Sequence, residues 1–74
     1  MKIHYDKEVD AAYIKLSDLR PTGVIEMAEG VNLDVTENDQ IVGIEILNGS
    51  QKFPLKSLFV CEYDPEVLTG IAST

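Results

Sequence analysis

Two stretches in the middle of the chain alternate between apolar residues and polar or small ones, and this pattern constrains the fold more than any other feature. It covers residues 31–35 and residues 42–46. A period of two places successive side chains on opposite faces of a β-strand. We therefore expect two strands that share one apolar face, joined at Asn38 and Asp39, because both residue types tolerate the positive φ of a tight turn.

The register of this hairpin follows from a two-residue loop at positions 38–39. Such a loop pairs apolar residues throughout, namely Val35 with Val42, Leu33 with Ile44 and Val31 with Ile46. A slip by one residue would place Leu33 opposite Gly43 or Glu45 and would turn the apolar set toward solvent. The apolar pattern therefore specifies the register.

A second hairpin precedes the first and shares its strand at residues 31–35. A three-residue loop over 28–30, with Gly30 in the left-handed conformation, pairs Met27 with Val31 and Ile25 with Leu33. Glu26 then lies opposite Asn32 on the polar face. A two-residue loop would place Glu26 against Leu33, so the longer loop is the preferred interpretation.

The N-terminal segment predicts a third hairpin with a four-residue loop over 7–10. This loop pairs Tyr5 with Ala12, Ile3 with Ile14 and, on the outer face, His4 with Tyr13. A competing helical interpretation rests on the i, i+3, i+4, i+7 spacing of the apolar residues of 9–16, with Asp10 as the N-cap. We prefer the strand, followed by a loop over 18–23 that contains proline and glycine.

The fold class expected from these patterns is α+β. It consists of an antiparallel β-meander of about five strands with one or two short C-terminal helices packed on its apolar face. The first helix is expected to begin at Pro54 and the second at Asp64, with a short strand over 59–63 as an alternative. The core expected on the sheet comprises Ile3, Tyr5, Ala12, Ile14, Leu16, Ile25, Met27, Val31, Leu33, Val35, Val42, Ile44 and Ile46, covered by Leu55, Leu58 and Phe59.

Length and charge exclude several classes of protein. The 74 residues predict a single small domain, 1–74, with a formal net charge of −7. So acidic a chain is not expected to bind DNA or RNA directly, because that needs cations to displace counterions. No apolar run approaches the roughly 20 residues of a membrane helix. Cys61 is the single cysteine, which predicts a cytoplasmic protein without internal disulfides. Because so short a chain buries little surface, a homo-oligomer or a partner is expected.

A family resemblance is carried by four segments in order: Ile3-His4-Tyr5-Asp6, then residues 10–16, then 30–34, then 41–47. Together they resemble the YuzE-like family, short prokaryotic proteins classed as a domain of unknown function, over about residues 2–50. The chain departs from the family pattern at Asp39-Gln40, where aspartate-glycine is usual. The resemblance implies no established activity, but some members look like partners of small toxin-like proteins, in the manner of antitoxins.

Candidates for chemistry are few. A nucleophilic pair of His4 and Cys61 would need the two side chains to meet in space, and the blander interpretation places His4 on an outer strand face. His4, Asp6 and Asp10 are the candidates for a divalent metal site or an acid–base site, although the two aspartates are more simply explained as turn caps. Gly43 marks a bulge or a close approach of a neighbouring group, of which the bulge is the preferred interpretation. We expect no cofactor.

The acidic surface is the remaining candidate site. Its predicted partner-binding residues are Glu26, Asn32, Asp34 and Glu45 on the outer face, with Glu37 and Asp39 at its rim. Such a face is either solvated or complementary to a basic protein. We therefore expect a non-enzymatic protein-interaction module, antitoxin-like, that shields a basic partner. The alternatives are a small metal-dependent or acid–base enzyme using His4, Asp6 and Asp10, and a self-associating structural domain.

Overall fold

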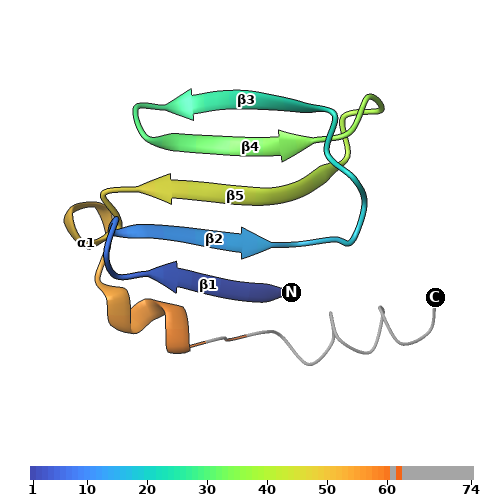
Figure 1. Cartoon of the computed structure of the whole chain (residues 1–74). Helices are drawn as coiled ribbons and strands as arrows, with labels where there is room; N and C mark the ends of the chain where they lie inside the picture. Colours follow the sequence, from blue (N-terminus) through green and yellow to red (C-terminus); the bar gives the residue numbers. More distant parts are fainter. Residues whose placement is uncertain (61, 63–74) are drawn as a thin grey trace.

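The computed structural model describes residues 1–60 and 62, and its main feature is a single antiparallel sheet of five strands (Figure 1). The elements are β1 (Lys2–Asp6), β2 (Ala11–Lys15), β3 (Gly23–Ala28), β4 (Val31–Val35), β5 (Ile41–Leu47), the short helix α1 (Gly49–Lys52) and the 3₁₀ helix η1 (Leu55–Phe59). The helical interpretation of residues 9–16 is therefore wrong, and the strand interpretation is confirmed.

The strand order corrects the predicted meander. The order across the sheet is β1-β2-β5-β4-β3, so β5 lies between β2 and β4 (Figure 1). After β2 the chain crosses to β3 at the far edge of the sheet. The strands β3, β4 and β5 then follow one another as hairpins, which brings β5 back beside β2. This is a Greek-key arrangement. The prediction failed because it paired only strands adjacent in the chain, whereas β5 uses both of its edges.

The first hairpin forms as predicted. Tyr5 pairs with Ala12, Ile3 with Ile14 and His4 with Tyr13. The four-residue loop closes with Asp10 at a φ of 52°, a left-handed conformation that aspartate tolerates better than most residues.

The other two hairpins have the predicted register in their centres but differ beside their turns. In β4–β5, Leu33 pairs with Ile44 and Val31 with Ile46 as expected, but Val35 pairs with Ile41, which leaves Val42 without a partner in β4. The predicted pair of Val35 and Val42 is therefore wrong. The turn has three loop residues rather than two, because the Thr36 N–H donates to the Gln40 carbonyl at 2.9 Å, and the bulge at Val42 absorbs the extra residue.

In the β3–β4 hairpin the loop is one residue shorter than predicted, whereas in β4–β5 it is one residue longer. Ile25 pairs with Leu33 and Glu26 with Asn32, as predicted, but Ala28 rather than Met27 pairs with Val31. The loop is two residues long, with Gly30 at a φ of 75°, and a bulge at Met27 restores the register. In both hairpins the bulge preserves the pairing of aliphatic side chains, which the burial of one face demands.

The core is much smaller than predicted. Among the described residues, the buried apolar side chains are Ala12, Val35 and Val42. Five predicted core or lid residues are exposed instead: Ile3, Leu16, Ile25, Met27 and Phe59. Leu55 and Leu58 are partly buried, as are the remaining predicted core residues Tyr5, Ile14, Val31, Leu33, Ile44 and Ile46.

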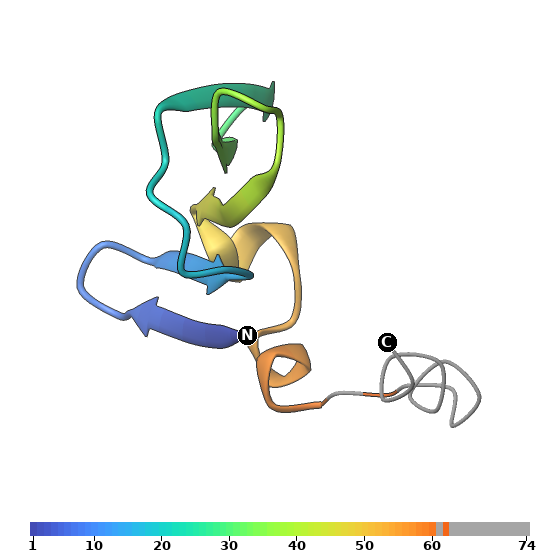
Figure 2. The ribbon, with the colours of Figure 1, turned by 90° about the vertical axis from the view of Figure 1, so that its right-hand side faces the viewer.

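The helical segments explain this lack of burial. Both α1 and η1 lie toward β1 and β2, whereas β3 forms the opposite edge of the sheet (Figures 1 and 2). Phe59 is 90% exposed, so it does not act as the predicted lid. Helix α1 was not expected, because Asn48-Gly49-Ser50 was interpreted only as the end of the sheet. Pro54 directly precedes η1, close to the predicted helix start, whereas the predicted helix at Asp64 lies outside the described residues.

Candidate functional site

A row of polar side chains crosses the whole outer face of the sheet, one from each strand. Successive pairings join His4 to Tyr13, Tyr13 to Glu45, Glu45 to Asn32 and Asn32 to Glu26. Strand alternation places all of these side chains on the same face. We call this set the polar row: His4, Tyr13, Glu45, Asn32 and Glu26.

The acidic end of the polar row lies on β5, β4 and β3. The Asn32 side-chain amide donates to Glu45 Oε1 at 3.1 Å. Glu26 lies on the other side of Asn32, on the edge strand β3, and is exposed. The amide therefore orients one carboxylate and separates it from the next, which relieves the repulsion that two directly opposed glutamates would suffer.

Asp34 lies beside the polar row, and Tyr13 holds it in place. The Tyr13 hydroxyl donates to Asp34 Oδ2 at 2.7 Å, although the two residues are on β2 and β4 and β5 lies between them. The tyrosine reaches that far because its ring passes over Gly43 of β5, where a Cβ would overlap the hydroxyl. Gly43 thus serves a close approach, the interpretation that the sequence ranked second.

This hydrogen bond also changes the titration of the tyrosine. The bond to the Asp34 carboxylate raises the pKa of Tyr13 above its ordinary value of 10.0, and partial burial and the charges of Asp34 and Glu45 add to the effect. Tyr13 is therefore a neutral donor at physiological pH. It fixes the Asp34 carboxylate on the face without neutralising its charge.

Glu37 and Asp39 lie in the turn between β4 and β5 and are exposed. Asp39 has a φ of 61°, and its N–H donates to the Thr36 carbonyl at 3.0 Å. The Thr36 hydroxyl accepts from two N–H groups of the turn, those of Asn38 and Gln40. The structure therefore brings four of the six predicted residues together on the strands, and the other two lie in the turn between β4 and β5.

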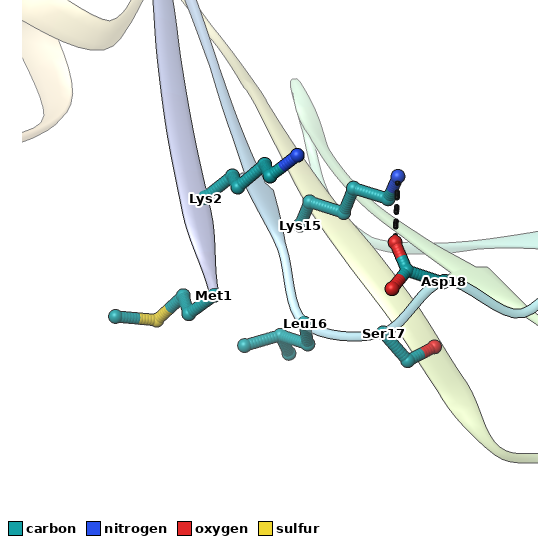
Figure 3. A pocket seen from close by; sticks show the side chains of 6 residues that line it. All are labelled: Met1, Lys2, Lys15, Leu16, Ser17 and Asp18. Carbon is teal, nitrogen blue, oxygen red and sulfur yellow. Dashed lines mark ion pairs between the residues drawn. The ribbon is translucent and has the colours of Figure 1, made fainter.

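The opposite end of the face is basic. Lys2 pairs with Lys15 across β1 and β2, and their side chains lie side by side while Met1 and Leu16 point away from them (Figure 3). Together with Ser17 and Asp18 these four residues line a hollow of about 90 Å³. Lys15 pairs with Asp18 at 3.1 Å, an exposed ion pair that adds little stability. The polar face thus carries two lysines on its β1–β2 side, one of them paired with Asp18.

A second polar cluster joins the first hairpin to α1, and sequence reasoning missed it. The Asp10 carboxylate accepts from the Tyr5 hydroxyl at 2.6 Å, from the Ser50 hydroxyl at 2.6 Å and from the Ser50 N–H at 3.0 Å. The Gly49 N–H donates to the Asp10 carbonyl at 2.8 Å. The three bonds to the carboxylate, that from the Ser50 hydroxyl first, lower the pKa of Asp10 below its ordinary 3.8. Asp10 therefore anchors α1 to the sheet.

This arrangement separates the three residues of the predicted metal or acid–base site. His4 belongs to the polar row, Asp6 accepts a hydrogen bond from the Glu8 N–H at 2.9 Å, and Asp10 binds Tyr5 and Ser50. In residues 1–60 and 62, no three His, Cys, Asp or Glu side chains are placed so that they could hold a metal ion. Cys61, the other member of the predicted nucleophilic pair, lies outside the described residues.

Comparison with known proteins identifies the family. A family model described as "Protein of unknown function (DUF2283)" matches residues 2–50, the span that holds all five strands. The chain belongs to this family. No curated protein and no solved structure matches the chain. Among the described helices of this DUF2283 member, none is long and apolar enough to cross a membrane.

Proposed function

We propose that this DUF2283 protein is a non-enzymatic binding module that holds a basic protein against the acidic end of its polar face. The observation that carries the proposal is the placement of Glu45, Asn32 and Glu26 on three adjacent strands, with Asp34 beside them. Hydrogen bonds from Asn32 and Tyr13 hold two of the carboxylates in fixed positions.

Fixed carboxylates suit recognition of a folded or extended basic partner. Carboxylates on strands lose little freedom on binding, so more of the interaction energy is available for affinity. The concentration of negative charge at one end of the face also steers a basic partner to that end and speeds its association. The basic pair Lys2 and Lys15 at the other end disfavours a partner that covers the whole face in the reverse orientation.

The resemblance to YuzE-like proteins indicates which class of basic protein the partner would belong to. Some members of that family look like partners of small toxin-like proteins, in the manner of antitoxins. An antitoxin-like role for this chain would use the acidic end of the polar face as the covering surface. No group on this face needs to perform chemistry in such a role.

The test is co-purification of the tagged chain from its native host at physiological salt. We expect a basic protein to be recovered with the wild-type chain and to be released as salt is raised, because ionic screening weakens exposed charge pairs. The double variant Glu26→Lys/Glu45→Lys should lose that protein. The matched variant Glu8→Lys/Glu62→Lys changes the net charge equally at exposed positions outside the polar row and should retain it.

Two results would contradict the proposal. Recovery of the tagged chain alone would show that no such partner binds under these conditions. Equal loss of the partner in both double variants would show that net charge, rather than this face, controls binding. Far-ultraviolet circular dichroism of each variant checks that the sheet is retained.

A further inference from the structure

An unbroken row of aliphatic side chains crosses the inner face of the sheet, on the side opposite the polar row. The pairings join Ile3 to Ile14, Ile14 to Ile44, Ile44 to Leu33 and Leu33 to Ile25. We call this set the aliphatic row: Ile3, Ile14, Ile44, Leu33 and Ile25. None of the five is buried, and the two ends, Ile3 and Ile25, are 40% and 44% exposed.

The hollows on this face show how incompletely the described chain covers it. A cavity of about 270 Å³ lies among Ile3, Ile14, Ile46, Phe53 and Leu58. A second, of about 380 Å³, lies between β1 and η1, with Tyr5 and Phe59 in its lining. Both hollows are open at the surface, so side chains from outside the described fold can enter them.

We infer that a second copy of this chain packs its aliphatic row against this one, so that the protein is a face-to-face homodimer. The inference is independent of the proposed function, which concerns the opposite face of the sheet. In a two-fold arrangement the same patch serves both copies. The projecting Ile25 edge of each copy can then enter the hollow beside Ile3 of the other.

Charge favours a second copy over another partner. No residue of the aliphatic row is charged, so this face offers a basic or acidic protein nothing to recognise. The chain carries a net charge of −7, and Glu26, Asp34 and Glu45 point away from the aliphatic row. Stacking two inner faces leaves both acidic faces on the outside, separated by two sheet layers, so their mutual repulsion stays small.

The area of the face sets how much of it a partner must cover. Strands about 4.8 Å apart and residues about 3.3 Å apart give a five-stranded face of roughly 24 by 17 Å, or about 400 Å² in projection for each copy. Two copies then give about 800 Å² before the relief of the side chains is added, whereas a specific interface buries about 1,200–2,000 Å². A partner must therefore cover all of the face that α1 and η1 leave open, as a second sheet does.

Pairing through the strand edges is less favourable. The free edge of β3 carries the bulge at Met27, which interrupts the regular ladder. The free edge of β1 carries the charged residues Lys2 and Asp6. Bulges and charges are features by which sheets avoid edge-to-edge pairing. The inner face is therefore the surface available for self-association.

The experiment compares two neighbouring substitutions on β3 by sedimentation velocity of the full chain. Ile25→Glu places a charge in the aliphatic row, whereas Val24→Glu places the same charge one residue away, on the polar face, at a position that is 64% exposed. We expect wild type and Val24→Glu to sediment with twice the 8.2 kDa mass of one chain, and Ile25→Glu to sediment as a single chain.

A second measurement does not depend on whether Ile25→Glu folds. In a mixture of isotope-labelled and unlabelled wild-type chains, filtered NOE spectra report contacts between copies. We expect intermolecular contacts from the methyl groups of Ile3, Ile25 and Leu33, and none from those of Val24. Contacts from Val24, or contacts confined to the backbone of one edge strand, would overturn the face-to-face arrangement. A wild-type chain that stays monomeric at millimolar concentration would also overturn it and would leave the inner face to another occupant, such as residues 61–74.

Discussion

Gly43 has no side chain because Tyr13 occupies the space that a Cβ would need. A Cβ there would overlap the tyrosine hydroxyl and would lie 2.9 Å from the Ile14 carbonyl oxygen. The ring in turn must cross this position, because its hydroxyl donates to Asp34 two strands away. One glycine thus allows three strands to be joined by a single side chain.

Gly43→Ala should therefore destabilise the fold by about 1–3 kcal/mol, the usual cost of an overpacked site. Gly23→Ala is the matched control, since a Cβ at Gly23 would meet only Val35 Cγ2 at 3.9 Å and should change stability by less than about 0.5 kcal/mol. Urea unfolding measures both. The cost of Gly43→Ala should also fall in a Tyr13→Ala background, and equal costs in the two backgrounds would show that the ring is not what excludes the methyl group.

Asp10 links pH to stability. Its pKa is lowered in the folded chain by the hydroxyl of Ser50, the hydroxyl of Tyr5 and the Ser50 N–H. A lowered folded pKa stabilises the fold above the unfolded value, near 3.8, and this stabilisation is lost as the pH falls through the folded pKa. Asp10→Asn should therefore be clearly less stable than wild type at pH 7, and the gap should shrink below about pH 3.8.

The measurement is urea unfolding of the two proteins across this pH range, with Glu8→Gln as an exposed control. Carbon-13 NMR titration of the Asp10 carboxyl provides a direct check, because Ser50→Ala should move its pKa back toward 3.8. A gap between wild type and Asp10→Asn that stays constant down to pH 2 would contradict this role for the carboxylate.

At the level of elements, the turn between β4 and β5 shows how a local conformation sets a register. Asp39 adopts a φ of 61°, and the three-residue loop that it completes obliges β5 to bulge at Val42. Asn38, its neighbour, is not among the residues with a positive φ. The strain of this hairpin is therefore concentrated in one aspartate.

Asp39→Ala should cost about 1 kcal/mol, because alanine is less tolerant of the left-handed conformation than aspartate. Asn38→Ala removes a similar side chain from a right-handed or extended position and should have a much smaller effect. Thermal unfolding of both variants distinguishes them. Equal effects would mean that the loop does not depend on the conformation of Asp39.

Most of the strands and of the polar face could be predicted from the sequence, because both follow from alternation within short segments. The four strand residues Glu26, Asn32, Asp34 and Glu45 share a face for that reason. Alternation could not predict that β5 pairs with β2 as well as with β4, because the apolar residues of β5 suit either strand equally. The signal that was missed is Gly43, whose empty position accepts the Tyr13 ring only when β2 lies beside β5.

The cluster around Asp10 was missed for a similar reason. The local sequence predicts a turn cap at Asp10 and the end of the sheet at Ser50, forty residues further along the chain. Their contact depends on the return of β5 to β2, a non-local event that residue patterns near either position do not report. The extent of the core was overestimated because alternation indicates which side chains share a face, but not whether anything covers that face.

At the level of the whole molecule, one sheet with two short helical segments leaves an apolar face in water. A chain of this size buries only about 60% of the surface of its unfolded form, and the described part buries three apolar side chains. Such a fold is only marginally stable alone, since a sheet needs a second layer on its apolar side. A second copy supplies that layer without exposing any new apolar surface.

The thermal midpoint should therefore depend on protein concentration. For a dimer that unfolds to two separate chains, a tenfold rise in concentration stabilises the folded state by about 1.4 kcal/mol. The unfolding entropy of two chains of this length converts that into a rise of roughly 4 °C. Ile25→Glu should unfold at a lower temperature that does not change with concentration, whereas Val24→Glu should follow the wild type. A wild-type midpoint that is constant over a hundredfold range of concentration would contradict the dimer, since only an intermolecular cover responds to mass action.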